Sequence, residues 1–420
     1  MKILITGTVG ESLPPPYAGI PKLTMLWARE WARSGHKIAI TFVHRHDHED
    51  DLGAGGEYFF EFASRPNKFK KILFLLKWFF ADPRLYFRLH RAYARFFGLT
   101  KEGIMYSSYG VWLGHLIKKF QPDLILGQAA LVKSFMAAHL AREHGIPFVL
   151  APYAEVHWLS NSRGENIAAT LGNYWRYFLS LPEVVLTCSW FCSNGSLLYA
   201  PPEKVEVIYP GIDVGLYTGG GSGVKQKMRE KFGLPPEAFI VLAVGAYTPR
   251  KGHDHIIDAV HLLREQGRDI FIALCGAGNP NWLLARAADY GMSDRLKVFQ
   301  KLSEQDLIDL YKTADIYCDA STTERACLGM SLTEAMSSGL PVVGYSIGGL
   351  PEVIHENENG FLAPFGNRLE LGKAILKMKQ LSGEERERLG REGVAVAGRE
   401  VDIKVAQVKV MAALERAVQR

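Results

Sequence analysis

The chain has 420 residues, 48% of them apolar and 22% charged, which is the composition of an ordinary globular protein with room for two domains of about 200 residues each. Its 49 lysines and arginines against 44 acids give a net charge of +5, far too small for a nucleic-acid-binding tail. We therefore exclude nucleic acid as a partner and expect an anionic small substrate or a membrane surface.

The cysteines and the lengths of the apolar runs indicate the cellular compartment in which we expect the protein. Five scattered cysteines lie mostly beside strand-like runs, which is typical of buried thiols in a reducing compartment. The first residues, MKILITGTV, favour a core strand over a signal peptide, and no stretch reaches about 18 uninterrupted apolar residues. We expect a cytoplasmic protein, with contact to the inner face of a membrane left open.

Short β-branched runs alternate with helical segments along the whole chain, a pattern typical of parallel sheets covered on both faces. We expect an α/β fold of two doubly wound, Rossmann-like domains that face each other across a cleft, with ligands beyond the carboxyl ends of the strands. The runs are KILIT, KIAITF, DLILG, FVLA, VVLTC and KVEVIY, then FIVLAV, IFIALC, LKVF, DIYCD and PVVGY.

The loop after the first run, GTVGESLPPPYAG, is stiffened by prolines and precedes a predicted helix with Leu23, Leu26, Trp27 and Trp31. A dinucleotide fingerprint would need G-x-G-x-x-G here, and this loop does not supply it. Nicotinamide chemistry is therefore disfavoured.

Residues 67–98 mix Lys and Arg with Phe, Tyr and Trp at helical spacing. Two basic aromatic helices of this kind can lie in a lipid interface and collect a lipid-borne substrate. Ordinary packing of aromatic helices inside the first domain explains the same pattern, so both interpretations stay open.

A domain boundary is expected after residue 208. Four glycines between 219 and 223 disfavour a helix or strand interior and indicate a flexible link within 209–235. We predict domains over 1–208 and 209–401. The remaining segment, 402–420, is predicted to be an amphipathic helix that can pack back on the first domain, with its apolar face at Val405, Val408, Met411 and Leu414.

The loop after FIVLAV carries two adjacent cations, Arg250 and Lys251, just before a predicted helix. Such a loop can hold a diphosphate, because Arg offers a planar fork, Lys a compact charge and the helix its positive end. The alternative is a solvated basic turn.

Two carboxylates belong to the next candidate site. Glu334 lies off the apolar face of a predicted helix, where it either forms a capping box with Ser331 or accepts the ribose hydroxyls of a nucleotide. Glu324 lies in the loop that follows the strand-like run IYCDAS and is either a ligand of substrate or a solvated loop acid. Gly348 and Gly349 follow another strand and could let backbone amides approach an oxyanion.

No metal is expected. His44, His46 and His48 could chelate an ion, as could the pair at 253 and 255, but such runs on loops after strands are more often solvated. The Cys188-x-x-x-Cys192 pair lacks the second half of a zinc site.

These segments together resemble glycosyltransferase family 4, which comprises retaining nucleotide-sugar transferases of the GT-B fold. The similarity runs from the first strand through Pro364. PYAGIPKLTMLWAREWARSGHKIAI has the spacing of the family's glycine-rich loop and helix, with Gly19 in the second glycine's place. VIYPGID closes the first domain in the family's manner, VGAYTPRKGHDHIIDAV resembles its phosphate loop, and GLPVVGYSIGGLPEVIHENENGFL is the strongest match.

The chain departs from the family at three places. Ala246 replaces an Arg that contacts the diphosphate, which leaves Lys251 as the matched cation. Tyr153 stands in place of a His near the reacting sugar, with His157 four residues on. The family's paired glutamates are separated by seven residues and Glu324 and Glu334 by nine, which we interpret as a two-residue insertion.

The resemblance implies an acceptor-binding first domain and a nucleotide-sugar-binding second domain. Lys251 and Arg250 would stabilise the leaving diphosphate, Glu334 would hold the ribose and Glu324 the sugar, with His157 a further catalytic candidate. We expect a retaining transferase that uses a saccharide or lipid-linked acceptor and no cofactor or metal. The alternatives are a binding protein without turnover and a GT-B nucleotide-sugar epimerase. Substrate contacts are expected at Gly19, Tyr153, Gly245, Gly329, Met330, Ser331, Glu334, Gly348 and Gly349.

Overall fold

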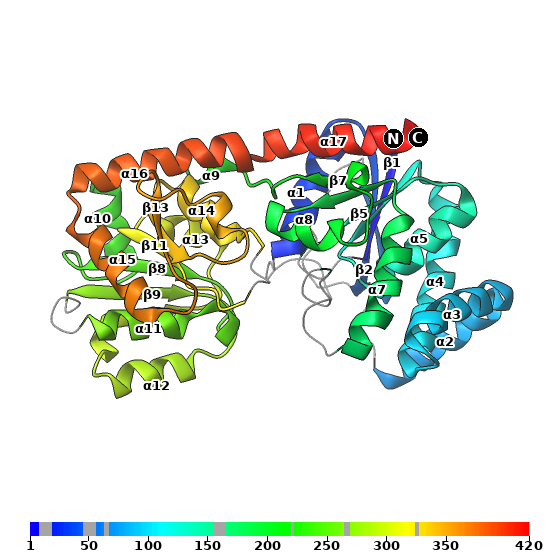
Figure 1. Cartoon of the computed structure of the whole chain (residues 1–420), viewed down its shortest axis with the longest axis horizontal. Helices are drawn as coiled ribbons and strands as arrows, with labels where there is room; N and C mark the ends of the chain where they lie inside the picture. The colour runs from blue at the N-terminus through cyan, green and yellow to red at the C-terminus, as the bar shows by residue number, and fades with distance from the viewer. Residues whose placement is uncertain are drawn as a thin grey trace. The chain divides into compact units, whose positions relative to one another are not determined.

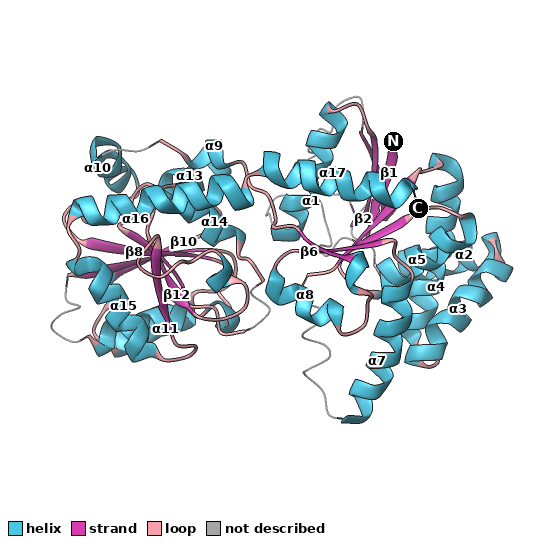
Figure 2. Cartoon of the chain, turned by 45° about the horizontal axis from the view of Figure 1, so that its top comes forward, coloured by secondary structure: helices cyan, strands magenta, loops and turns pink. Residues whose placement is uncertain are grey.

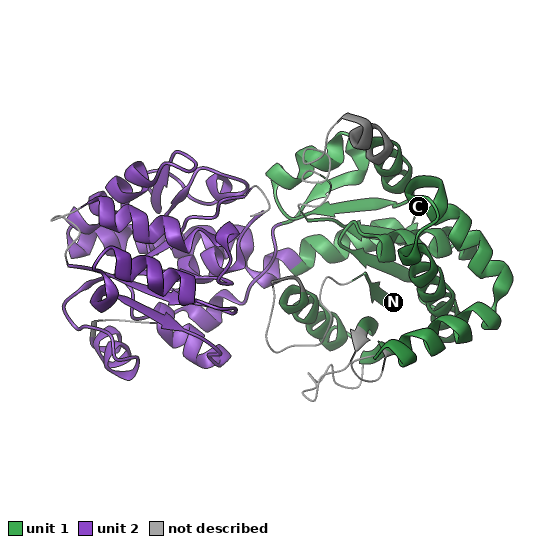
Figure 3. Ribbon diagram, turned by 90° about the horizontal axis from the view of Figure 1, so that it is seen from below, with its two compact units in different colours: residues 1–208, 407–420 green, residues 209–406 purple. Residues whose placement is uncertain are grey.

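The computed structural model describes residues 1–7, 19–44, 56–62, 67–153, 156, 165–219, 222–263, 269–323 and 327–419. The chain forms two compact units, one of Met1–Ile208 with Gln407–Arg420 and one of Tyr209–Ala406 (Figure 3). Each unit is built on one parallel sheet with helices on its faces (Figure 1). The expected α/β fold of two Rossmann-like domains is thereby confirmed.

The first sheet has the strand order β3-β2-β1-β4-β5-β6-β7, and every neighbouring pair is parallel. Because the chain adds strands to one side of β1 and then returns to the other, the order reverses between β1 and β4. The strands are β1 (Lys2–Thr6), β2 (Lys37–His44), β3 (Gly56–Phe62), β4 (Leu124–Gln128), β5 (Phe148–Ala151), β6 (Val184–Thr187) and β7 (Val205–Val207).

The helices of the first unit pack around an aromatic core. The predicted helix after the first loop is present, and its Leu23, Trp27 and Trp31 are buried. The 67–98 segment forms two helices that lie beside α4 (Figure 2). The helices are α1 (Gly19–Arg33), α2 (Lys68–Ala81), α3 (Pro83–Phe97), α4 (Lys101–Phe120), α5 (Val132–His144), α7 (Glu165–Ser180), α8 (Trp190–Leu197) and the later part of α17 (Ile403–Gln419).

The second sheet has the order β10-β9-β8-β11-β12-β13, again parallel throughout, and reverses between β8 and β11. Its strands are β8 (Phe239–Val244), β9 (Ile270–Cys275), β10 (Leu296–Phe299), β11 (Ile316–Asp319), β12 (Val342–Tyr345) and β13 (Gly360–Ala363). Its helices are α9 (Val214–Tyr217), α10 (Ser222–Lys231), α11 (His253–Leu262), α12 (Asn281–Asp289), α13 (Glu304–Tyr311), α14 (Met330–Ser337), α15 (Arg368–Gln380) and α16 (Gly383–Val396).

Two expectations about the chain's later half were wrong. The predicted flexible link contains α9 and α10, and Gly223 is the second residue of α10, which can hold it because one glycine costs a helix only about 1 kcal/mol. Of the predicted apolar face of α17, Leu414 is buried but Val408 is exposed. The buried residues of this helix are Ile403, Ala406, Val410, Ala413, Leu414 and Ala417. Arg416 of this helix contacts Glu206 of the first unit, Nη2 to Oε2 at 2.6 Å.

The cysteines, all of them in described segments, form no disulfide, and four of the five are buried. Among the helices that the structure describes, none combines the length and the apolar character needed to cross a bilayer.

Candidate active site

The carboxyl ends of β8 and β11 mark the candidate site in the second unit. In open α/β sheets ligands bind where the strand order reverses, just beyond the carboxyl ends of the two central strands. The loops after β8 and β11 are tied together there, because Thr322 donates its backbone N–H to the Arg250 carbonyl at 2.9 Å and its hydroxyl to the Pro249 carbonyl at 3.0 Å. The predicted phosphate loop and the loop that leads to α14 therefore meet.

Glycine is required where these loops touch. Gly252 has φ +63°, and a Cβ there would lie 1.8 Å from the carbonyl oxygen of Ala320. A Cβ on Gly276, after β9, would lie 1.8 Å from the carbonyl oxygen of Gly245. Three loops are thus packed backbone to backbone at the carboxyl edge of the sheet.

Lys251 ends a short 3-10 turn, Pro249–Lys251, and its aliphatic stem lies along Gly245. A Cβ on Gly245 would come 3.1 Å from Cδ and 3.2 Å from Cε of that lysine, so the glycine makes room for the stem. Lys251 is half-buried and Arg250 is exposed. Neither forms an ion pair with a residue that the structure describes, so both charges are available to an anion.

His253 and Asp319 are buried beside this loop. Burial, with a smaller effect of the Lys251 charge, lowers the pKa of His253 to about 4, while Asp319 acts in the opposite direction. Asp319 accepts hydrogen bonds from the backbone N–H and the hydroxyl of Ser321, at 3.0 and 2.6 Å. The expectation that the histidines at 253 and 255 are solvated was wrong, since His255 contacts Tyr345 at 3.0 Å.

Glu334 is a buried carboxylate in α14, only 4% exposed. Its Oε2 accepts a hydrogen bond from the Tyr311 hydroxyl at 2.9 Å. The helix is capped by Gly329 without a side-chain bond, so the capping-box interpretation of Ser331 and Glu334 was wrong. Ser331 instead accepts from the Tyr317 hydroxyl at 2.9 Å.

The start of α14 and the loop after β12 are joined. Gly349 donates its N–H to the carbonyl of Cys327 at 3.0 Å, so this amide is already used and cannot be the oxyanion donor that the sequence suggested. Gly348 has φ +59°. Gly329 and Met330 form the N-terminal end of α14 beside this contact, where a helix carries partial positive charge.

Two of the predicted site residues lie in the described part of the first unit. Gly19 begins α1, and Tyr153 is a half-buried residue just after β5. Glu324 and His157 lie outside the described residues.

Sequence reasoning missed a polar cluster at the carboxyl ends of β1 and β4. The hydroxyls of Thr6 and Tyr109 lie 2.5 Å apart, and Thr41 donates to Thr6 at 2.9 Å. The side-chain oxygen of Gln128 accepts a hydrogen bond from Thr24. All these side chains are buried, and each alone resembles a core position, so only the strand order reveals the cluster.

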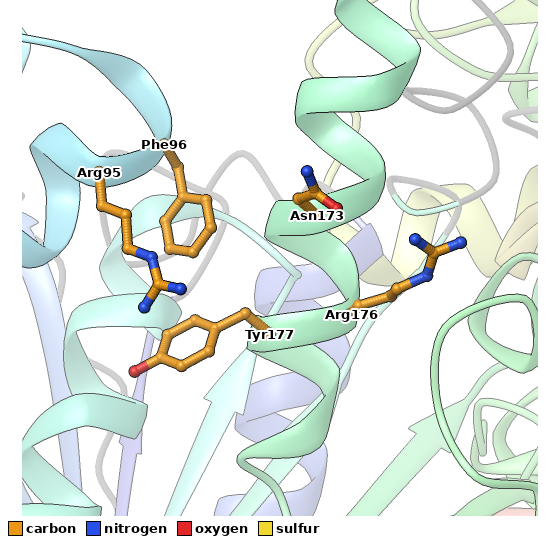
Figure 4. A pocket seen from close by; sticks show the side chains of 5 residues that line it. All are labelled: Arg95, Phe96, Asn173, Arg176 and Tyr177. Carbon is orange, nitrogen blue, oxygen red and sulfur yellow. The ribbon is translucent and has the colours of Figure 1, made fainter.

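A separate hollow of about 480 Å³ lies between α3 and α7, as Figure 4 shows. The Arg95 guanidinium is 5.3 Å from the ring centres of both Phe96 and Tyr177, while Arg176 points away from them. Asn173 completes the lining. None of the lining residues directly follows a strand, so we place the active site at the strand ends and not in this hollow.

Two family models match the chain. The model described as Glycosyltransferase Family 4 matches residues 17–216, and Glycosyl transferases group 1 matches 224–395. With the two parallel sheets, these matches define a glycosyltransferase of the GT-B fold. The chain belongs to the family-4-like glycosyltransferases, as the sequence resemblance predicted.

Curated relatives match part of the chain. The D-inositol 3-phosphate glycosyltransferase of Corynebacterium efficiens is 31% identical over 202 residues, which are 46% of this chain and 47% of that protein. The protein of the same name from Mycolicibacterium smegmatis is 32% identical over 171 residues, 40% of this chain and 38% of its own length. The matched part thus spans less than half the length of these relatives.

Solved structures show the same fold over the whole chain. HepE of Anabaena, in a complex with UDP and glucose, has a TM-score of 0.72 at 18% identity and covers 99% of this chain and 100% of its own. Sucrose-phosphate synthase of Thermosynechococcus elongatus has a TM-score of 0.74 at 15% identity and covers 99% and 98%.

Proposed function

We propose that the chain transfers a sugar, with retention of anomeric configuration, from a nucleotide-diphosphate sugar to a saccharide or lipid-linked acceptor. The observation that carries this proposal is the meeting of the basic loop after β8 with the loop before α14, where the second sheet reverses its strand order. The complex of HepE with UDP and glucose and the names of the curated relatives support a nucleotide-sugar donor.

The donor diphosphate would lie between Lys251 and the N-terminal end of α14. Lys251 supplies a compact charge whose stem is fixed against Gly245, and Arg250 supplies a planar fork that matches phosphate oxygens. The helix adds the partial positive charge of Met330 and Ser331 at its first turn.

Glu334 would accept the ribose hydroxyls, with its other contact to Tyr311 holding the carboxylate in place. Glu324 is proposed to hold the hydroxyls of the donor sugar. Gly19, Tyr153 and His157 are proposed to line the acceptor site in the first unit.

The reaction requires no protein nucleophile in this proposal. The bond between the anomeric carbon and the diphosphate oxygen breaks, and the acceptor oxygen attacks the same face of the sugar. The leaving phosphate oxygen takes the acceptor's proton. The protein contributes by positioning the reactants and stabilising the departing negative charge with its cations, which is why we propose that no metal is needed.

Product stereochemistry tests the mechanism. Incubation with UDP-, GDP- and ADP-sugars and a panel of saccharide and lipid-linked acceptors should give a product whose anomeric configuration, measured by NMR, equals that of the donor. An inverted product would contradict same-face attack.

A binding protein without turnover is the second candidate, favoured by Ala246 at the family's arginine position and by the occupied amide of Gly349. Nucleotide binding without transfer to any acceptor would support it. Donor incubated alone separates an epimerase, which would change the sugar without an acceptor.

We also propose that the enzyme works in the cytoplasm at the inner face of a membrane, in contact with it through residues 67–98. Cysteines without disulfides suit a reducing compartment. A lipid-linked acceptor would place the reaction at a bilayer surface, as in polysaccharide or glycolipid biosynthesis.

A further inference from the structure

Helix α2 carries an apolar stripe on the face that points away from the protein. Five large side chains recur every three or four residues, which places them on one side of a helix with 3.6 residues per turn. They are between 49% and 71% exposed, an unusual value for so many large apolar groups on one helix. They are Phe69, Ile72, Leu73, Leu76 and Phe80.

The opposite face of α2 supplies its packing. Phe74 is buried and Trp78 meets the ring of His115 on α4 at 5.1 Å. The Ser108 hydroxyl of α4 donates to the carbonyl of Leu75 at 3.5 Å. The helix is therefore fixed to the first unit by its inner face, and the outer stripe is not needed to hold it.

The stripe continues onto α3. Phe79 connects the two helices, because its ring lies 5.1 Å from that of Phe80 and 5.8 Å from that of Phe87. Phe87 is itself 60% exposed. Figure 1 shows α2 and α3 beside α4 at the periphery of the first unit.

Positive charge surrounds the stripe. Residues 67–98 hold four lysines and four arginines against one acid, Asp82, so the segment has a net charge of 8 − 1 = +7, more than the +5 of the whole chain. Asp82 is used as the cap of α3, where it accepts from the N–H of Leu85 at 2.9 Å. Exposed Lys68 flanks the stripe on one side, and Lys70 and Lys77 flank it on the other.

We infer that this face binds the surface of an anionic lipid bilayer, with the five apolar side chains inserted between headgroups and the flanking lysines in contact with lipid phosphates. Long lysine stems can follow the apolar surface while their ammonium groups reach the headgroups. Anionic lipids attract such clusters of basic residues.

The charge distinguishes a bilayer from the other possible occupants. A second copy of the chain would bring two sets of exposed lysines together, Lys68, Lys70 and Lys77 on each copy, and repulsion between like charges would oppose that contact. The cores of protein interfaces are also depleted of lysine. In the membrane contact proposed above, the outer face of α2 is thus the inserted face and the lipid is anionic. This contact does not depend on glycosyl transfer.

Flotation with vesicles tests the inference. The full chain is mixed with vesicles of phosphatidylcholine alone or with added phosphatidylglycerol and centrifuged through a density gradient. We expect it to float with the anionic vesicles, to stay behind with the neutral ones, and to dissociate at high salt, because salt screens the attraction.

Two variants divide the apolar from the charged contribution. F69S/L73S/F80S removes three of the five apolar side chains of the stripe, and K68E/K70E/K77E reverses the charge of the lysines beside it; each should reduce the bound fraction at least tenfold. The control V408S/K404E/K409E changes a valine on α17 that is as exposed as Phe80, together with two exposed lysines of the same helix. It should float like the unaltered chain.

Circular dichroism and nucleotide calorimetry on the same samples show whether each variant is folded, and they separate a failure of membrane binding from a failure of the proposed function. The inference is overturned if the unaltered chain binds neither vesicle, or if F69S/L73S/F80S floats undiminished. It is also overturned if this face instead joins two copies, which would appear in size-exclusion chromatography as a dimer lost in that variant.

Discussion

The two units share the strand order around their central strands but differ in the groups at the carboxyl ends. In the second unit, Lys251 and the end of α14 offer positive charge beside loops packed through glycine. In the first, the hydroxyls and the amide of Thr6, Tyr109 and Gln128 are buried, and they are hydrogen-bonded to protein side chains. One topology thus carries exposed and half-buried cations at one sheet edge and an internal polar cluster at the other, because these differences lie in the side chains at the strand ends and not in the strand order.

A substitution that disrupts the backbone packing of the second unit should have the largest effect on stability and on nucleotide binding. Gly252→Ala should lower the free energy of unfolding by about 3 kcal/mol or more and abolish nucleotide binding. The added Cβ would clash with the Ala320 carbonyl, and the positive φ of this position is unfavourable for alanine. The measurement is urea unfolding at neutral pH.

Gly291→Ala is the matched control for that substitution. Its φ of +64° is nearly the same, but no atom lies within 4 Å of the added Cβ. It should cost only about 1 kcal/mol and leave nucleotide binding intact. Equal effects of the two substitutions would show that the close approach of the loops is unimportant.

A buried histidine in the second unit and a half-buried histidine in the first extend the comparison to the dependence of stability on pH. Burial lowers the pKa of His253 in the second unit and of His139 in the first to about 4, from 6.5. Both histidines must lose a proton to fold, so their contribution to stability is complete above about pH 6.5 and is lost as the pH falls toward 4. For His253 the loss approaches about 3 kcal/mol.

Urea unfolding between pH 7 and pH 4.5 measures this loss. His253→Gln and His139→Gln should each flatten the dependence on pH, whereas His144→Gln, at an exposed position, should leave it unchanged. A pH dependence that neither His253→Gln nor His139→Gln changes would show that other groups cause it.

Removal of the Tyr311 hydroxyl should change stability less than the glycine and histidine substitutions described above. Tyr311→Phe leaves the buried Glu334 carboxylate without this donor and should cost about 1–2 kcal/mol of unfolding free energy. Nucleotide affinity should fall as well, because the carboxylate is no longer held in place. Calorimetry showing unchanged affinity would remove Tyr311 from the account of the ribose site.

Much of the fold could be predicted because core strands in parallel sheets are continuous apolar runs. The strands β3 and β13 were not predicted. In β3, GEYFFEF, two acids interrupt the aromatic residues, and β13, GFLA, contains only two large apolar residues, so neither segment is a continuous β-branched run.

The site was predictable where its residues are adjacent in sequence, as with Arg250 and Lys251 after a strand. Asp319 and Tyr311 were missed because their roles depend on contacts with other segments: Tyr311 reaches Glu334 from another helix, 23 residues away in the chain. The burial of His253 was missed for the same reason, since only the packed loops enclose it.

The central claim is that the carboxyl edge of the second sheet binds a nucleoside diphosphate through the loop after β8. Isothermal titration calorimetry with UDP, GDP and ADP tests it on three proteins: the unaltered chain, Lys251→Ala, and the control Lys373→Ala, which removes an exposed lysine paired with Glu370 on α15. The account predicts that at least one nucleotide binds, that Lys251→Ala weakens it by about 10- to 100-fold through loss of a charge-assisted contact, and that Lys373→Ala does not. Undiminished binding to Lys251→Ala, or no binding of any of the three nucleotides to the unaltered chain, would contradict it.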